Sequence, residues 1–219
     1  MLRDLWKTDT KPPSLNSADK GLSSAALTRS SNGLDQFFAS LQDREGLTIL
    51  DLAGASQANV SFITNFGHRI YSEDILHTLD ESFGGGGDFL ENQSDPQRMA
   101  AFLRQSLDFP EAHFDGALVW DTLQFLSPAL LQETVDRLAR ILRPQASLLA
   151  FFSAEEKVKS IPLYSYRIVN SKTLSLHPRG QGKAAQFFNN RTLEKLFQNF
   201  YSVKFFLTRD HLREVIVKR

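Results

Sequence analysis

The chain has 219 residues, with 25 basic and 25 acidic side chains, no cysteine and 42% hydrophobic residues. Its length favours one domain with appendages, large enough to bury a core without disulfides or metal ions. The lack of cysteine excludes a disulfide scaffold, a cysteine-based zinc site and a cysteine nucleophile, and the zero formal charge disfavours nucleic acid as a partner.

No apolar run reaches the ~20 residues of a membrane span, and the first residues lack the apolar core of a secretory signal. We therefore expect a cytoplasmic protein with no membrane partner. Residues 1–31 are rich in Ser, Thr, Asn and Lys and contain Pro12 and Pro13. Such a stretch buries little apolar surface. We expect a flexible N-terminal segment over 1–31 and one folded domain over 32–219.

Helical and strand-like patterns alternate along that domain. Apolar residues at helical spacing predict helices over 32–44, 56–67, 96–107, 128–143 and 189–200. Short apolar runs predict buried strands over 47–52, 69–73, 114–120 and 147–152. Residues 201–209 and 213–219 predict two closing strands that pair antiparallel near Asp210. The stretch 75–83 is ambiguous, residues 84–87 predict a flexible break, and 155–186 shows no strong periodicity.

This alternation predicts an α/β fold of the doubly wound, Rossmann-like class. Parallel strands joined by right-handed crossovers place helices on both faces of a mostly parallel sheet. In such sheets a ligand lies beyond the carboxyl ends of the strands, where the strand order reverses. The residues that follow each predicted strand are therefore the candidates for binding.

Three strand ends carry such candidates. Asp51 is followed by the small residues Ala53, Gly54 and Ala55, which would let the backbone approach a ligand near a helix N-terminus. Asp74 comes 23 residues after Asp51, close to the spacing of an acid that binds ribose. Trp120 and the following Asp121 end the third strand. Each has a purely structural alternative. The small residues form a tight turn, Asp74 is a solvated acid at a strand end, and Trp120 is a core residue.

These strand ends, in this order, resemble the class I S-adenosylmethionine-dependent methyltransferases, in particular the type-11-like branch. The resemblance rests on ILDLAGASQ, YSEDI, DFPEAHFDGALVWDTLQFL and LARILRPQASLLAFF, and covers roughly residues 47–152. It implies a seven-stranded-type sheet with an antiparallel last strand. It also implies S-adenosylmethionine as cofactor, held by residues at the positions of the family motifs: Asp51, Ala53, Gly54, Ala55, Asp74, Asp108 and Trp120.

The chain departs from the family pattern at its glycine-rich turn. Ala53, Ala55 and Gln57 stand where the family has glycine, so the motif is degenerate. The side chain of Gln57 either fills part of the cofactor space or points away from it. Asp108 matches the acid that contacts adenine only if the loop before strand 114–120 is shortened.

The sequence predicts no catalytic residue and no metal site. His113 and His177 form no recognisable catalytic pair, and the histidines lack metal-ligand spacing. Residues 155–186 occupy the place of a substrate-side insertion in the family. Its charged and aromatic side chains suit an anionic or aromatic acceptor, or else belong to a solvated loop: Tyr164, Tyr166, Arg167, Lys172, Arg179 and Lys183.

Two functions therefore remain open, with a third less favoured. The leading hypothesis is a methyltransferase that acts on an unidentified small-molecule or protein acceptor. The alternative is a non-catalytic, methyltransferase-like module for protein interaction or regulation, a pseudoenzyme, which the degenerate turn favours. NAD(P) as the ligand is disfavoured because no Gly-x-Gly-x-x-Gly follows the first strand.

Overall fold

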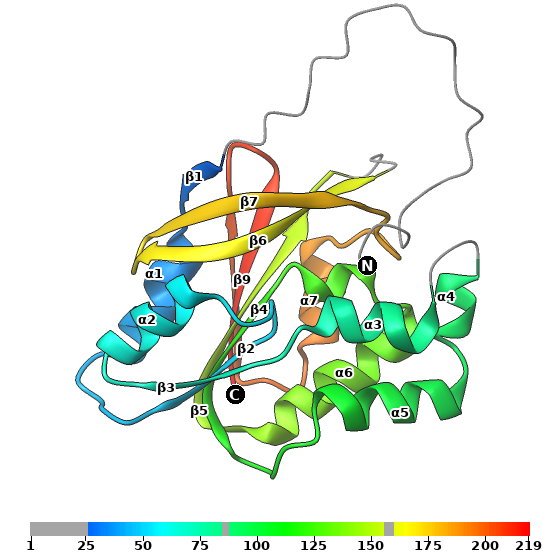
Figure 1. The fold of residues 1–219 in the computed structure, drawn as a ribbon, viewed down its shortest axis with the longest axis horizontal. Helices are drawn as coiled ribbons and strands as arrows, with labels where there is room; N and C mark the ends of the chain where they lie inside the picture. Colours follow the sequence, from blue (N-terminus) through cyan, green and yellow to red (C-terminus); the bar gives the residue numbers. More distant parts are fainter. Residues whose placement is uncertain (1–25, 85–87, 156–159) are drawn as a thin grey trace, which may run out of the picture.

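The computed structural model describes residues 26–84, 88–155 and 160–219, and its centre is one mixed sheet (Figure 1). The strands lie in the order β3-β2-β4-β5-β9-β8. Their bounds are β2 Thr48–Asp51, β3 Arg69–Ser72, β4 Phe114–Trp120, β5 Leu142–Ser153, β8 Ser202–Leu207 and β9 Leu212–Lys218. The first four run parallel, and β9 pairs antiparallel with both β5 and β8. The Rossmann-like class and the antiparallel last strand are confirmed.

This main sheet differs from the expected seven-stranded type. Among the described residues it has six strands, and β3 forms one edge. The ambiguous stretch after β3 is helical, because Asp74 accepts a hydrogen bond from His77 N and so caps the first turn. Residues 85–87 of the predicted flexible break lie outside the described residues.

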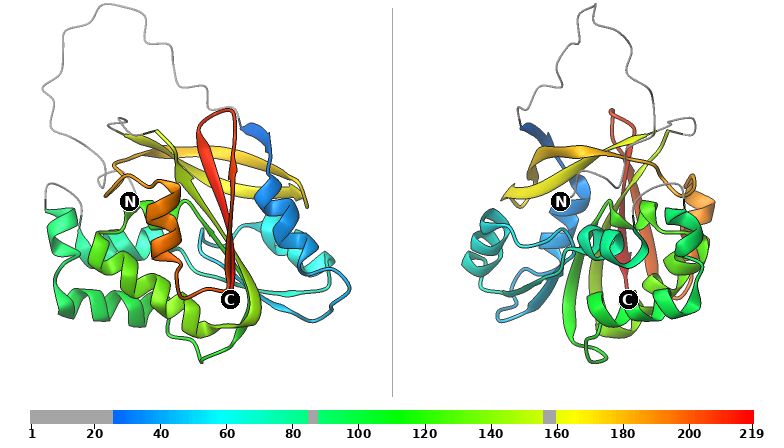
Figure 2. Two further views of the ribbon diagram at one scale, coloured as in Figure 1. Left: turned by 180° about the vertical axis from the view of Figure 1, so that it is seen from behind. Right: turned by 45° about the vertical axis from the view of Figure 1, so that its right-hand side comes forward.

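Helices cover both faces of the main sheet, as Figure 2 shows. Neighbouring residues of β4 point to opposite cores: Leu118 and Trp120 pack with α1 and α2, whereas Ala117 and Val119 pack with the helices of the other face. The helices are α1 Asn32–Ala39, α2 Gln57–Asn65, α3 Ile75–Phe83, α4 Phe89–Asn92, α5 Pro96–Ser106, α6 Pro128–Ile141 and α7 Asn190–Leu196, with a 3-10 turn over Thr122–Phe125.

A second, three-stranded antiparallel sheet crosses above the carboxyl ends of the main strands (Figure 1). It consists of β1 Leu27–Ser30, β7 Thr173–Gly182 and β6 Ile161–Asn170. Sequence reasoning missed this sheet in two places. Leu27–Ser30 lies in the segment expected to be flexible, yet it pairs with β7. The stretch 155–186 contains the β6–β7 hairpin, whose alternating apolar residues pack against the main sheet.

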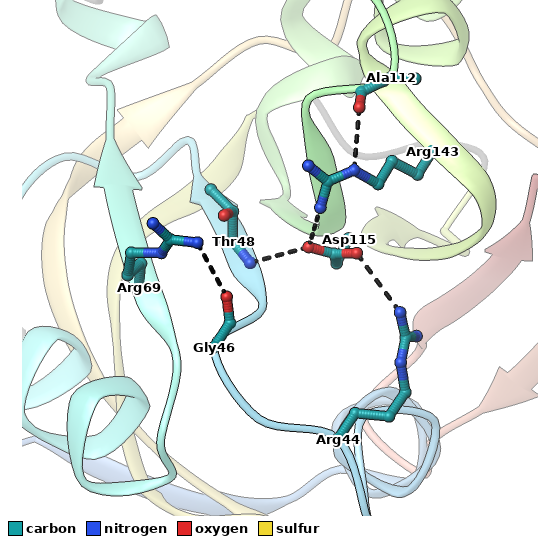
Figure 3. A network of polar contacts seen from close by, with 7 residues as sticks. All are labelled: Arg44, Gly46, Thr48, Arg69, Ala112, Asp115 and Arg143. Atoms are coloured by element: carbon teal, nitrogen blue, oxygen red, sulfur yellow. Dashed lines mark hydrogen bonds and ion pairs between the residues drawn. The ribbon is translucent and has the colours of Figure 1, made fainter.

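The amino end of the main sheet is held by a buried carboxylate, as Figure 3 shows. Asp115 of β4 accepts hydrogen bonds from Thr48 N, at 2.9 Å, and from Arg143, at 2.5 Å. It also pairs with Arg44, which lies 3.4 Å away. This cluster ties the starts of β2, β4 and β5 together.

No helix in the described parts of the chain is both long and apolar enough to cross a membrane.

Candidate functional site

The strand order reverses between β2 and β4. The chain passes from β2 outward to β3, then returns to β4 on the other side of β2. A ligand crevice is therefore expected beyond the carboxyl ends of β2 and β4. The structure brings three of the predicted residues to this edge: Asp51 ends β2, Trp120 ends β4, and Asp74 follows β3.

Asp51 is fully buried, and both of its carboxylate oxygens accept hydrogen bonds from the protein itself. It accepts hydrogen bonds from Trp120 Nε1 at 2.7 Å, Asn59 Nδ2 at 2.9 Å and Ala53 N at 3.1 Å. Burial raises the pKa of Asp51, and these donors lower it only in part, because all three are neutral. Asp51 thus holds the turn and the tryptophan in place and offers no free oxygen to a ligand.

Trp120 is a core residue in an unusual backbone conformation. Its φ of 57° lies in the left-handed region, which a bulky residue rarely adopts. Its indole stacks on the ring of Tyr166 from β6, with centroids 5.0 Å apart and planes 5° apart. This strained residue at the reversal point is held by its hydrogen bond to Asp51 and by the stack.

Asp121 and Tyr166 form a second buried pair beside the stack. Tyr166 donates a side-chain hydrogen bond to Asp121. Burial raises the pKa of Asp121 to about 7, although this hydrogen bond and the charge of Arg179 oppose the rise. Burial also raises the pKa of Tyr166 well above its usual range. The sequence indicated both residues but could not pair them, because Asp121 follows β4 whereas Tyr166 lies on β6, far along the chain.

Asp74 is partly accessible, with 31% of its side chain exposed. Its Oδ1 caps α3 by accepting from His77 N at 3.0 Å. Its Oδ2 lies 3.4 Å from Nη2 of Arg179, which comes from β7. The carboxylate that the sequence assigned to a ribose is therefore paired with a cation of the hairpin.

The turn after β2 is folded tightly against Asp74. Gly54 has a φ of 83°, and a Cβ at this position would lie 3.0 Å from Asp74 Oδ2. The amide of Gly54 donates to Glu73 O at 3.0 Å. Gln57 points away from the crevice, because its side chain is exposed and donates to Ser61 on α2. Of the two alternatives for Gln57, the structure supports the second.

Other candidates lie away from this cluster. Asp108 follows α5, is exposed, and pairs with Arg137 of α6 at 3.2 Å. His113 lies just before β4, against Tyr71 of the edge strand. His177 contacts Ser175 Oγ at 3.0 Å on the hairpin. The described residues contain no group of three or more side chains suited to a metal ion.

Asn59 is a site residue that sequence reasoning missed. Its side chain donates to Asp51 and to Tyr166 O, and accepts from Ile168 N at 2.8 Å. It therefore joins α2, β2 and the hairpin. The only signal in the sequence is an amide in the first turn of a helix, a pattern too common to single out.

No family model and no curated protein sequence matches this chain. Solved structures match this chain at low sequence identity. A S-adenosylmethionine-dependent methyltransferase from Archaeoglobus fulgidus is 12% identical, with a TM-score of 0.49 over 85% of this chain and 91% of that one. The 1,6-didemethyltoxoflavin-N1-methyltransferase of Burkholderia thailandensis, crystallised with S-adenosylhomocysteine, is 14% identical, with a TM-score of 0.48 over 85% and 76%. These likenesses are distant, so we derive function from the crevice.

The residues at the carboxyl ends of β2, β3 and β4 fit an adenosyl cofactor in part. Asp74 and the turn of small residues at 53–55 are reachable from outside. Asp51, Trp120 and Asp121 are buried by the hairpin and by one another. Tyr166 stacks on Trp120 and bonds to Asp121, whereas Asp74 is partly exposed beside Arg179.

Proposed function

We propose that this protein is a S-adenosylmethionine-dependent methyltransferase that acts on an unidentified small-molecule or protein acceptor. The observation that carries the proposal is the reversal of strand order between β2 and β4, with a half-buried carboxylate at the end of the neighbouring strand β3. This is the place where doubly wound sheets bind nucleotide-like ligands.

The residues have separate roles in this proposal. The bound cofactor supplies an activated methyl group. Asp74 accepts hydrogen bonds from ribose hydroxyls, and Ala53, Gly54 and Ala55 leave space for the ligand beside the backbone. Asp51 acts through its contacts with Ala53 and Trp120 and is a positioning residue.

A pocket of about 150 Å³ beyond the ends of β4 and β5 suits the acceptor. Gln124, Ser153 and Glu155 give it a polar side, and Phe187 and Phe188 give it an apolar side. Its volume is below the roughly 300–1,000 Å³ of sites for drug-sized ligands. It therefore suits the methylated group of the acceptor rather than a whole cofactor.

Calorimetric titration of the full chain with S-adenosylhomocysteine and S-adenosylmethionine tests this function. We expect micromolar binding, weakened about ten- to hundredfold by Asp74→Ala, since hydrogen bonds to a charged group contribute roughly 1.5–3 kcal/mol. Asp108→Ala, which removes an exposed carboxylate outside the crevice, should bind like the parent. Absence of heat at millimolar ligand in both parent and Asp108→Ala would contradict the proposal.

A non-catalytic module is the second candidate. It is favoured by the internal hydrogen bonds of Asp51 and by the Trp120–Tyr166 stack, because both occupy the ends of β2 and β4 with the chain's own side chains. In that case Asp51, Trp120 and Tyr166 serve only to hold the hairpin against the main sheet. Titration separates the two candidates, because such a module binds neither adenosyl ligand.

A further inference from the structure

We propose that the pocket beyond the ends of β4 and β5 binds one uncharged aromatic ring that carries a hydroxyl group, so that the acceptor is a phenol. The naming of an acceptor rests on the proposed function, but binding in the pocket can be measured without any adenosyl ligand. The size of the pocket, its two kinds of wall and its charge all favour such a ring.

The walls of the pocket are fixed by the tertiary structure. Gln124 lies in the 3-10 turn after β4, and its main-chain oxygen accepts from Ala185 N at 2.9 Å, which holds the segment that follows β7. Phe188 O in the same segment accepts from Arg213 Nη1 of β9 at 2.5 Å. The pocket has a volume of about 150 Å³. An apolar cavity of about 150 Å³ holds one benzene ring, so the space suits a single ring.

The apolar side of the pocket suits a flat ligand. It is lined by Ile161, Phe187 and Phe188. Phe188 is buried and its ring packs against that of Phe152 from β5, with centroids 4.7 Å apart, whereas Phe187 is half-buried. Phenyl rings favour offset-stacked or edge-to-face contacts with another ring. An aromatic ligand therefore gains more here than an aliphatic one of equal volume.

The polar side of the pocket offers both a donor and an acceptor. Gln124 is 1% exposed, and its Oε1 accepts from Ser153 N at 3.0 Å. No residue that the structure describes accepts a hydrogen bond from its Nε2, so this amide group can donate to a ligand. Glu155 adds a carboxylate, which accepts hydrogen bonds. A phenolic hydroxyl both donates and accepts, so a single oxygen atom can pair with both groups.

The charge of the lining favours an uncharged ring. Among the described residues that line the pocket, none is basic, and Glu155 is the one acid. A carboxylate ligand would lose water there without gaining a cationic partner. Glu155 is itself exposed, and a solvated acid of this kind binds a cation only weakly. Of the two acceptor classes expected from the sequence, anionic and aromatic, the pocket favours the aromatic one.

Fluorine NMR titration of the full chain with 4-fluorophenol, fluorobenzene and 4-fluorobenzoate at neutral pH tests the pocket. We expect 4-fluorophenol to bind with millimolar affinity, about fivefold more tightly than fluorobenzene, because a hydrogen bond between uncharged groups contributes a factor of this order. 4-Fluorobenzoate should not bind. Equal affinity for 4-fluorophenol and fluorobenzene, or preference for 4-fluorobenzoate, would overturn the inference.

Phe187→Ala shows whether the ring binds in the pocket. This variant should bind 4-fluorophenol about fivefold more weakly than the parent, because one apolar wall is removed. Phe109→Ala is the matched control. Phe109 is also half-buried, but it packs on Phe114 at the start of β4, at the opposite end of the main sheet. An equal loss of affinity in both variants, or no loss in Phe187→Ala, would place the ring elsewhere and overturn the inference.

Gln124→Met tests the polar side. Methionine has a similar length but no amide, so the preference for 4-fluorophenol over fluorobenzene should fall to less than about twofold. The variant also leaves Ser153 N without its acceptor, so its fold is checked by circular dichroism. If it does not fold, the comparison of the three ligands in the parent decides. A preference that is unchanged in a folded Gln124→Met would overturn the assignment of the hydroxyl group to Gln124.

Titration with S-adenosylhomocysteine and S-adenosylmethionine separates this inference from the proposed function. Binding of 4-fluorophenol that is sensitive to Phe187→Ala, in a chain that binds neither adenosyl ligand, supports the aromatic site and refutes the proposed function. Adenosyl binding without binding of 4-fluorophenol refutes the inference and leaves the proposed function standing.

Discussion

The amino and carboxyl ends of the main sheet each bury carboxyl groups, but different partners stabilise them. At the amino end, Asp115 faces two arginines and one backbone amide. At the carboxyl end, Asp51 receives only neutral donors, and burial raises its pKa. Asp121 also depends on a neutral phenol, with Arg179 contributing only its charge.

The difference separates a structural clamp from a candidate site. A buried carboxylate with cationic partners is compensated and holds strands together. Carboxyl groups that stay under-compensated have perturbed pKa values, a feature that is concentrated at functional sites. The strained backbone of Trp120 lies at the same end as the raised pKa values.

The largest expected effect is a pH dependence that arises at the carboxyl end. Asp121 titrates near 7 in the folded chain but near 3.8 when unfolded. Between these values the folded state binds the extra proton, so stability falls as pH rises from about 4 to about 7 and is level above that. The loss is on the order of 4 kcal/mol.

Urea unfolding of parent and Asp121→Asn across this pH range measures the effect. The groups that face the Asp121–Tyr166 pair are Arg179, Arg29 and Tyr164, and all remain in the variant. Asp51 and Glu214, whose pKa values are also raised, contribute equally to both proteins. Parallel stability curves for the two proteins would show that Asp121 does not carry the proton.

Asp115→Ala tests the clamp at the amino end. Removal of the carboxylate leaves Thr48 N unpaired in the interior, while the half-exposed Arg44 and Arg143 turn to water. We expect a loss of about 2 kcal/mol in the free energy of unfolding. Asp108→Ala breaks an exposed pair and should cost less than about 1 kcal/mol. Similar losses in the two variants would show that the Asp115 cluster stabilises the fold no more than an exposed ion pair does.

Gly54→Ala tests how tightly the turn packs on Asp74. The left-handed backbone and the 3.0 Å approach to Asp74 Oδ2 should together cost about 1–2 kcal/mol. Gly67→Ala is the control, because its φ of 88° brings similar strain but nothing lies within 4 Å of the added Cβ. A greater loss at Gly54 than at Gly67, measured by thermal unfolding, isolates the contact with Asp74.

Gln57→Ala should have the smallest effect. Its side chain is exposed and donates a hydrogen bond to Ser61 on its own helix, so we expect a loss of less than about 0.5 kcal/mol in the free energy of unfolding. Affinity for S-adenosylhomocysteine should also stay the same, because the side chain does not enter the crevice. A marked gain in affinity would mean that Gln57 enters the crevice after all.

The sequence by itself determined the α/β class and most of the main sheet. Buried parallel strands are continuous apolar runs, and helices repeat every 3.6 residues, so 114–120 and 128–143 were recognisable from local patterns. The edge of the sheet expected to bind a ligand was recognisable too. In a parallel sheet this edge lies at the carboxyl ends of the strands, so it consists of the residues that follow each apolar run. Asp51, Asp74 and Trp120 could therefore be named in advance, while Asp108 could not be placed.

Only the tertiary structure decided what these residues contact. The β6–β7 hairpin is more than 40 residues from β2, β3 and β4, so no local pattern links Tyr166 to Trp120 or Arg179 to Asp74. Whether an acid is free, saturated or paired depends on burial and on partners distant in the chain. For the same reason, the raised pKa values of Asp51 and Asp121 could not be read from the sequence, because they result from burial in the tertiary structure.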